Sequence, residues 1–228
     1  CDRGHEYIAG QEAHSYKFEG GGAAVLGGIQ PQPLPFNPRG ELVQDQVNQA
    51  IKPDDFHFAR TQLVCLENTQ GGKVLSSDYL NQFGAFVRSK DLRFHLDGAR
   101  VFNAAVRQNV PVKAITGLFD SVSICLSKGL GCPAGSLLVS DAVTIQKARR
   151  YRKMLGGGMR QVGIIAASGM FALQHHVDRL EIDHRNASNL GDALSQLEHI
   201  SLAEPVQTNM VMLDLSGVDV KRLQAFLL

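Results

Sequence analysis

The sequence lacks the features by which several large classes of protein are known. Its four cysteines form no CxxC pair, so neither a zinc site nor a redox dithiol is indicated. Its net charge of +1 provides no basic surface for nucleic acid or for an anionic membrane. No apolar run approaches the roughly 20 residues of a membrane-spanning helix. We therefore expect no metal, no nucleic acid and no membrane among the partners of this protein.

The remaining composition is that of an ordinary globular protein. The 228 residues are 44% hydrophobic and 20% charged, which suits one large domain, or one domain and part of another. Cys65 and Cys125 lie in apolar runs, which favours free thiols in a reducing compartment, and we expect a cytoplasmic protein. The chain starts at Cys1 and stops at Leu228 within an apolar helical pattern. These ends are typical of an internal fragment, for which any targeting peptide would lie upstream.

Apolar strand-like runs alternate with helical patterns along the chain. This alternation predicts an α/β fold with a mostly parallel sheet flanked by helices. The four prolines between residues 31 and 38 predict a loop. A helical region extends from Arg160 to about Leu197, with a kink expected near residues 175–178. The clearest strands are predicted at residues 6–9, 61–66, 92–96, 122–126, 136–139 and 210–215, and the clearest helices at residues 41–51, 77–87 and 142–154.

The chemistry is concentrated in residues 92–128. A strand-like run ends on Asp97, and a second apolar run is followed by Lys128 and a glycine-rich loop. A helical pattern connects the two runs. Such a βαβ unit brings an acid and an amine to the carboxyl edge of a parallel sheet, where ligands bind. This pair suits pyridoxal phosphate, which needs a lysine for its Schiff base and an acid for its pyridine nitrogen.

Each of these residues also has a plainer interpretation. Lys128 follows an apolar strand, where partial loss of hydration makes an amine a competent nucleophile, but a lysine at a strand end can also extend into solvent. A buried Asp97 requires a cationic partner, which is either the pyridinium ring or Arg100 three residues later. Arg100 is in turn a candidate for a bidentate contact with a carboxylate.

Other motifs carry less weight. Residues 129–134 match the GxGxxA string of dinucleotide-binding loops, but they contain Pro133 and lead into a strand, so a dinucleotide-binding oxidoreductase is rejected. The basic run at residues 147–153 is interpreted as a solvated helix face. His95 shares a strand face with Asp97 and is placed to support it. The histidines expected to be solvated are His175, His176, His184 and His199.

Longer strings carry a resemblance to a known family. HLDGARVFNA, ICLSKGLGCPAGSLL, RKMLGGGMRQVG, GGAAVLGGIQPQP and LENT, in this sequence, are similar to the low-specificity L-threonine aldolases. Those are fold-type I pyridoxal-phosphate enzymes of the aspartate aminotransferase superfamily. The resemblance implies a large cofactor-binding domain over residues 1–178 and the start of a smaller α/β domain over residues 179–228. It also implies that a phosphate-binding loop lies upstream of Cys1 and a further carboxylate-binding arginine beyond Leu228.

The resemblance implies roles for three residues of the central stretch. Lys128 in LSKGLG matches the lysine that forms the Schiff base with the cofactor. Asp97 in LDGAR matches the aspartate that pairs with the pyridine nitrogen. Arg100 matches an arginine that helps to hold the carboxylate of the amino acid.

Residues outside that stretch are matched as well. His14 in GQEAHSY matches the histidine that stacks on the cofactor ring, and His57 in DDFHFAR matches a second histidine close to the substrate side chain. Arg160 in GGGMRQ matches an arginine on the phosphate side. Glu19 and Glu67 lie in matched segments without an assigned role.

The implied reaction is retro-aldol cleavage of L-threonine or L-allo-threonine to glycine and acetaldehyde. His14 or His57 would take the proton of the β-hydroxyl group. The alternatives are another fold-type I lyase that eliminates at Cβ, and an inactive relative that serves as a subunit. Active sites of this superfamily lie between two subunits, so the resemblance implies a homodimer or a homotetramer.

Overall fold

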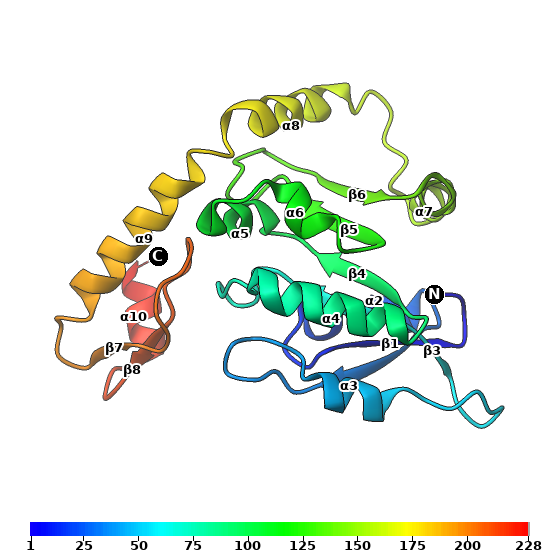
Figure 1. The fold of residues 1–228 in the computed structure, drawn as a ribbon. Helices are drawn as coiled ribbons and strands as arrows, with labels where there is room; N and C mark the ends of the chain where they lie inside the picture. The colour runs from blue at the N-terminus through cyan, green and yellow to red at the C-terminus, as the bar shows by residue number, and fades with distance from the viewer. Residues whose placement is uncertain (228) are drawn as a thin grey trace.

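A six-stranded sheet forms the centre of the computed structural model, which describes residues 1–227 (Figure 1). The strand order is β2-β1-β3-β4-β5-β6, and all neighbouring strands are parallel except β5 and β6. The predicted α/β class with a mostly parallel sheet is confirmed. The strands are β1 His5–Gly10, β2 Gln30–Leu34, β3 Arg60–Glu67, β4 Arg93–Asp97, β5 Ser121–Cys125 and β6 Ser136–Ser140.

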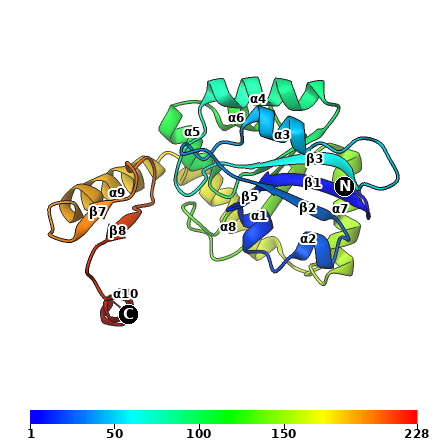
Figure 2. The same ribbon diagram turned by 90° about the horizontal axis from the view of Figure 1, so that it is seen from below.

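Helices cover both faces of this sheet (Figure 2). On one face lie α3 Gln44–Ala50, α4 Ser77–Ser89, α5 Val101–Gln108 and α6 Val112–Thr116, and on the other lie α1 His14–Lys17, α2 Gly22–Val25 and α8 Gly163–His175. The main core lies between the sheet and the first group, where Ile8, Val64, Phe83 and Leu96 are fully buried. Helix α7, Ala142–Met154, follows β6 and has no buried residue, which confirms the basic run as a solvated face.

The start of α4 shows how local chemistry fixes an element. Ser76 is the N-cap, and its side-chain oxygen accepts a hydrogen bond from the Tyr79 N–H at 3.2 Å. The buried residues Leu80, Phe83 and Val87 then follow at the spacing of one helix face. The predicted helix is therefore confirmed.

The proline-rich segment is a strand as far as Leu34 and a loop from Pro35 onward, so the predicted loop is wrong for its first part. Strand β2 pairs only with β1, so it is an edge strand of the sheet. Proline has no N–H to donate and is tolerated at an edge, where its nitrogen faces away from the neighbouring strand. Pro31 and Pro33 are two residues apart and so present their nitrogens to the same side. The one free edge of β2 accommodates both.

The predicted long helical region is two helices, α8 and α9 Leu180–Leu194, which separate where the kink was expected. Helix α9 leads to a separate antiparallel pair, β7 Ile200–Leu202 and β8 Leu213–Leu215, followed by α10 Val220–Leu227. This second unit stands beside the large sheet (Figure 1). Over residues 1–227, no helix has both the length and the apolar character required to cross a bilayer.

Candidate active site

The strand order creates a switch point at the carboxyl edge of the sheet, between β1 and β3. After β1 the chain crosses to β2 on one side, and β3 then pairs with the other side of β1. Ligands of open parallel sheets bind beyond the carboxyl ends of the strands at such points. Glu67 ends β3, Asp97 ends β4, and Lys128 follows β5. The fold therefore places two acids and an amine along one edge.

Asp97 is held by the turn that follows β4. Its Oδ1 accepts a hydrogen bond from the Ala99 N–H at 3.1 Å, and the other oxygen has no protein partner among residues 1–227. The alternative ion pair with Arg100 is not formed. At the adjacent Gly98, an added Cβ would lie 2.8 Å from the carbonyl oxygen of Ser123, so only glycine fits between β4 and β5.

Lys128 lies in a tight loop after β5. The Gly131 N–H donates to the carbonyl oxygen of Lys128 at 2.8 Å. His176, just after α8, donates from Nδ1 to the carbonyl oxygen of Leu130 at 2.7 Å and so holds the same loop. The prediction that His176 is solvated is therefore wrong, because the end of α8 packs on this loop. Lys128 is half-buried and has no carboxylate within ion-pair distance in the described part of the chain.

His14 reaches the same edge from the loop after β1. Its backbone N–H donates to Oε2 of Glu67 at 3.0 Å, across 53 residues of sequence. The ring is 48% exposed, with Nδ1 3.4 Å from Oε1 of Glu19, and it packs on Phe18 with 4.8 Å between the ring centroids. An imidazole with one open face at this edge is available to a ligand.

Glu67 is a site residue to which the sequence assigned no role. It is 8% exposed, and burial raises the pKa of its carboxyl group. The hydrogen bond from the His14 N–H lowers the pKa of Glu67, as do the charges of His14 and Lys128. The charge of Asp97 raises it further. Glu67 thus lies within electrostatic range of three predicted site residues. The signal that could have identified it is the one that identified Asp97, an acid at the end of a buried strand.

Two buried polar atoms next to Glu67 have no protein partner among the described residues. They are Nδ2 of Asn68 and Oγ1 of Thr69, in residues that are at most 2% exposed. The amide of Asn68 is oriented by its Oδ1, which accepts from the Leu75 N–H at 3.3 Å. An unpaired buried polar group costs about 1–3 kcal/mol, so such atoms are normally paired.

The structure does not bring His57 to this edge within one chain, and no contact of the described residues joins Arg160 to it. His57 precedes β3 and therefore lies at the amino edge of the sheet, where its Nδ1 is 2.7 Å from Oδ1 of Asp55. Arg160 precedes α8, whose Ile165 lies beside Gly135 at the start of β6 and whose opposite end contacts the Lys128 loop through His176. Both predicted residues are exposed.

Two further histidines have side-chain partners. Nδ1 of His95 lies 2.7 Å from Oγ of Ser121, and burial lowers the pKa of His95 while Asp97 opposes that change. Nε2 of His184 accepts from Nδ2 of Asn103 at 3.1 Å, and burial again lowers the histidine pKa. His184 was predicted to be solvated, and this is wrong because α9 packs against α5 at that point.

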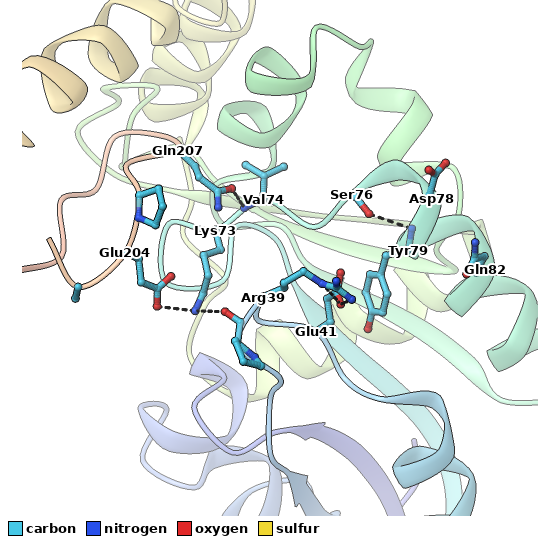
Figure 3. Close-up of a pocket in the computed structure, with 13 residues that line it drawn as sticks. Arg39, Glu41, Lys73, Val74, Ser76, Asp78, Tyr79, Gln82, Glu204 and Gln207 are labelled. Atoms are coloured by element: carbon cyan, nitrogen blue, oxygen red, sulfur yellow. Dashed lines mark hydrogen bonds and ion pairs between the residues drawn. The ribbon is translucent and has the colours of Figure 1, made fainter.

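A pocket of about 730 Å³ lies elsewhere, between the start of α4 and residues 203–207 (Figure 3). Lys73 Nζ lies 2.7 Å from Oε1 of Glu204, and the Val74 N–H donates to Gln207 at 2.9 Å. Arg39 pairs with Glu41 and Lys73 with Glu204, and no predicted site residue lines the pocket. We therefore assign it to the junction of the two sheets and not to chemistry.

Comparisons with known proteins identify the family of the chain. A sequence model described as beta-eliminating lyase matches residues 1–217. The low specificity L-threonine aldolase of Escherichia coli strain K12 is 55% identical over 196 residues, which cover 86% of this chain and 59% of that protein. The low-specificity L-threonine aldolase 1 of Arabidopsis thaliana is 38% identical over 94% of this chain and 62% of its own length.

Among solved structures, the threonine aldolase of Leishmania major superimposes with a TM-score of 0.81 over 98% of this chain and 66% of its own. Its sequence identity of 22% makes this a likeness of fold. The chain spans about three fifths of the length of the curated relatives that it matches.

Proposed function

Because this chain belongs to the beta-eliminating lyase family, we propose that the full-length protein is a pyridoxal-phosphate-dependent lyase that cleaves L-threonine or L-allo-threonine to glycine and acetaldehyde. The observation that carries the proposal is the placement of Asp97 and Lys128 at the carboxyl ends of two neighbouring parallel strands. The names of the aldolases to which the chain is similar support threonine as the substrate.

The residues at this edge fit pyridoxal phosphate. That cofactor, when bound, supplies an aldehyde carbon and a ring that accepts electrons. Lys128 is the amine for the aldehyde, because it is half-buried and not engaged by a carboxylate of the described chain. Asp97 offers a free carboxylate oxygen to the ring nitrogen, and His14 is assigned to the ring face.

The substrate is handled by an arginine and a histidine in this proposal. Arg100, at the start of α5, holds the carboxylate of the amino acid through charge-assisted hydrogen bonds. His14 or His57 takes the proton of the β-hydroxyl group, since imidazole titrates near neutral pH. Removal of that proton accompanies cleavage of the Cα–Cβ bond and releases acetaldehyde. The Cα atom then regains a proton, which completes glycine.

A homodimer or homotetramer in which neighbouring copies share sites is part of the proposal. It is supported by the position of His57 at the edge opposite Asp97 within one chain. Exposed apolar side chains such as Val139, Met154 and Ile164 also favour a covered surface. The proposed division after residue 178 is supported by the separate sheet of β7 and β8, and a cytoplasmic location by the four free cysteines.

Shared sites predict that two inactive variants restore each other. A mixture of His57→Ala and Lys128→Ala subunits forms mixed dimers in which one site receives Lys128 from one copy and His57 from the other. Random 1:1 assembly into two-fold symmetric dimers should recover about a quarter of wild-type activity. The measurement is aldolase activity after the variants are unfolded and refolded together. If the mixture is no more active than the separately refolded variants, His57 and Lys128 of each site belong to the same chain.

Product analysis tests the reaction itself. The full-length protein, supplied with pyridoxal phosphate and L-threonine or L-allo-threonine, should release glycine and acetaldehyde in equal amounts. A β-eliminating lyase would instead release a keto acid and ammonia. An inactive relative would release neither, although it retains Lys128, Asp97 and Arg100.

A further inference from the structure

Glu67 connects the two sides of the switch point. It ends β3, where its register partner on β4 is Asp97, and its Oε2 accepts the backbone N–H of His14 from the loop after β1. A single buried carboxyl group therefore joins the segment that carries His14 to the strand next to Asp97. No other described side chain accepts a hydrogen bond from the His14 N–H.

The groups around Glu67 come from every element packed against it. Asp97 faces it from β4, His14 from the loop after β1, Lys128 from the loop after β5, and Cys65 lies on its own strand. Burial raises the pKa of Glu67, Asp97 adds to the rise, and His14 and Lys128 oppose it. The charge of Asp97 therefore disfavours the ionised form of Glu67.

We propose that Glu67 is a positioning residue of this site, which fixes His14 through its backbone N–H and places a second carboxyl group beside Asp97. The inference rests on the proposed function, since His14 and Asp97 act on a cofactor only if it binds at this edge. When Glu67 loses its proton, the added negative charge strengthens the hold of Asp97 on a protonated ring nitrogen.

Two substitutions separate these effects. Glu67→Gln keeps an acceptor oxygen for the His14 N–H but cannot ionise, whereas Glu67→Ala removes both. The matched control is Glu6→Gln, because Glu6 is fully buried at the amino edge of the same sheet and accepts from Thr61 at 2.9 Å. Urea unfolding shows whether each variant folds. If the Ala variant does not fold, the Gln variant still tests the proposal.

The pH dependence of kcat/KM is the first readout. The Gln variant should match the wild type at low pH, where Glu67 is protonated, and fall roughly three- to tenfold below it as the pH rises through the titration of Glu67. The control should follow the wild type at every pH. The second readout, in cofactor-free protein, is hydrogen exchange of the His14 amide, which should be faster in the Ala variant and unchanged in the Gln variant.

A Gln variant with the wild-type pH profile, or an Ala variant with wild-type exchange at His14, overturns the proposal. Failure of the proposed function is recognised separately, because wild-type protein would then form no adduct with pyridoxal phosphate on Lys128. The exchange measurement does not require the cofactor, so it decides the positioning role of Glu67 in either case.

Discussion

Borohydride reduction of the protein after incubation with pyridoxal phosphate is expected to leave a phosphopyridoxyl group on Lys128, detected by peptide mass mapping. Lys128 is half-buried in the loop after β5, and no carboxylate of residues 1–227 competes for its amine. Lys73 and Lys147, in contrast, already pair with Glu204 and Asp2. The adduct should therefore form on the one lysine that the fold brings beside Asp97.

Lys128→Ala should remove this adduct and lower kcat by at least on the order of 1000-fold, since loss of a covalent nucleophile is among the largest single effects in enzymes. Lys147→Ala is the matched control, because Lys147 lies on the exposed α7 and should leave both adduct and rate unchanged. A wild-type protein that forms no adduct would favour the inactive relative, and an adduct that persists in the Lys128 variant would mean that another amine binds the cofactor.

The order of strands and helices could be predicted because it depends on local patterns. Thr61–Leu66 is an apolar run that becomes β3, and the spacing of Leu80, Phe83 and Val87 predicts α4 from sequence alone. Asp97 could be identified on the same basis, as an acid at the end of a predicted strand. Strand β2 could not, because only its position at the edge of the sheet makes its prolines acceptable.

The remaining parts of the site depend on contacts between distant residues. Glu67 gains its importance from His14, 53 residues earlier, and from the pairing of β3 with both β1 and β4. His176 and His184 find their partners 46 and 81 residues away, so their polar sequence surroundings were misleading.

Asp97→Asn should lower kcat on the order of 100- to 1000-fold, because it removes the charge that keeps the cofactor ring protonated while leaving the shape of the side chain intact. An opposite charge within hydrogen-bond distance typically shifts the pKa of a basic nitrogen by about 1–3 units toward the charged form. Without that charge the ring nitrogen loses its proton more readily, and the neutral ring accepts electrons poorly. The amide oxygen of Asn can still accept the Ala99 N–H, so the turn after β4 is retained.

The decisive comparison is between the kcat of the variant and the amount of borohydride-stable adduct that it forms on Lys128. The Asp97→Asn variant should still form the borohydride-stable adduct on Lys128, because the lysine and its loop are held by Gly131 and His176 and not by Asp97. Loss of rate with retained adduct assigns Asp97 to the electronic role, since a merely structural role would reduce both together. Asp97→Ala, which also loses the acceptor for Ala99, should be at least as slow. Near-normal turnover in the Asn variant would show that the charge of Asp97 does not contribute to the reaction.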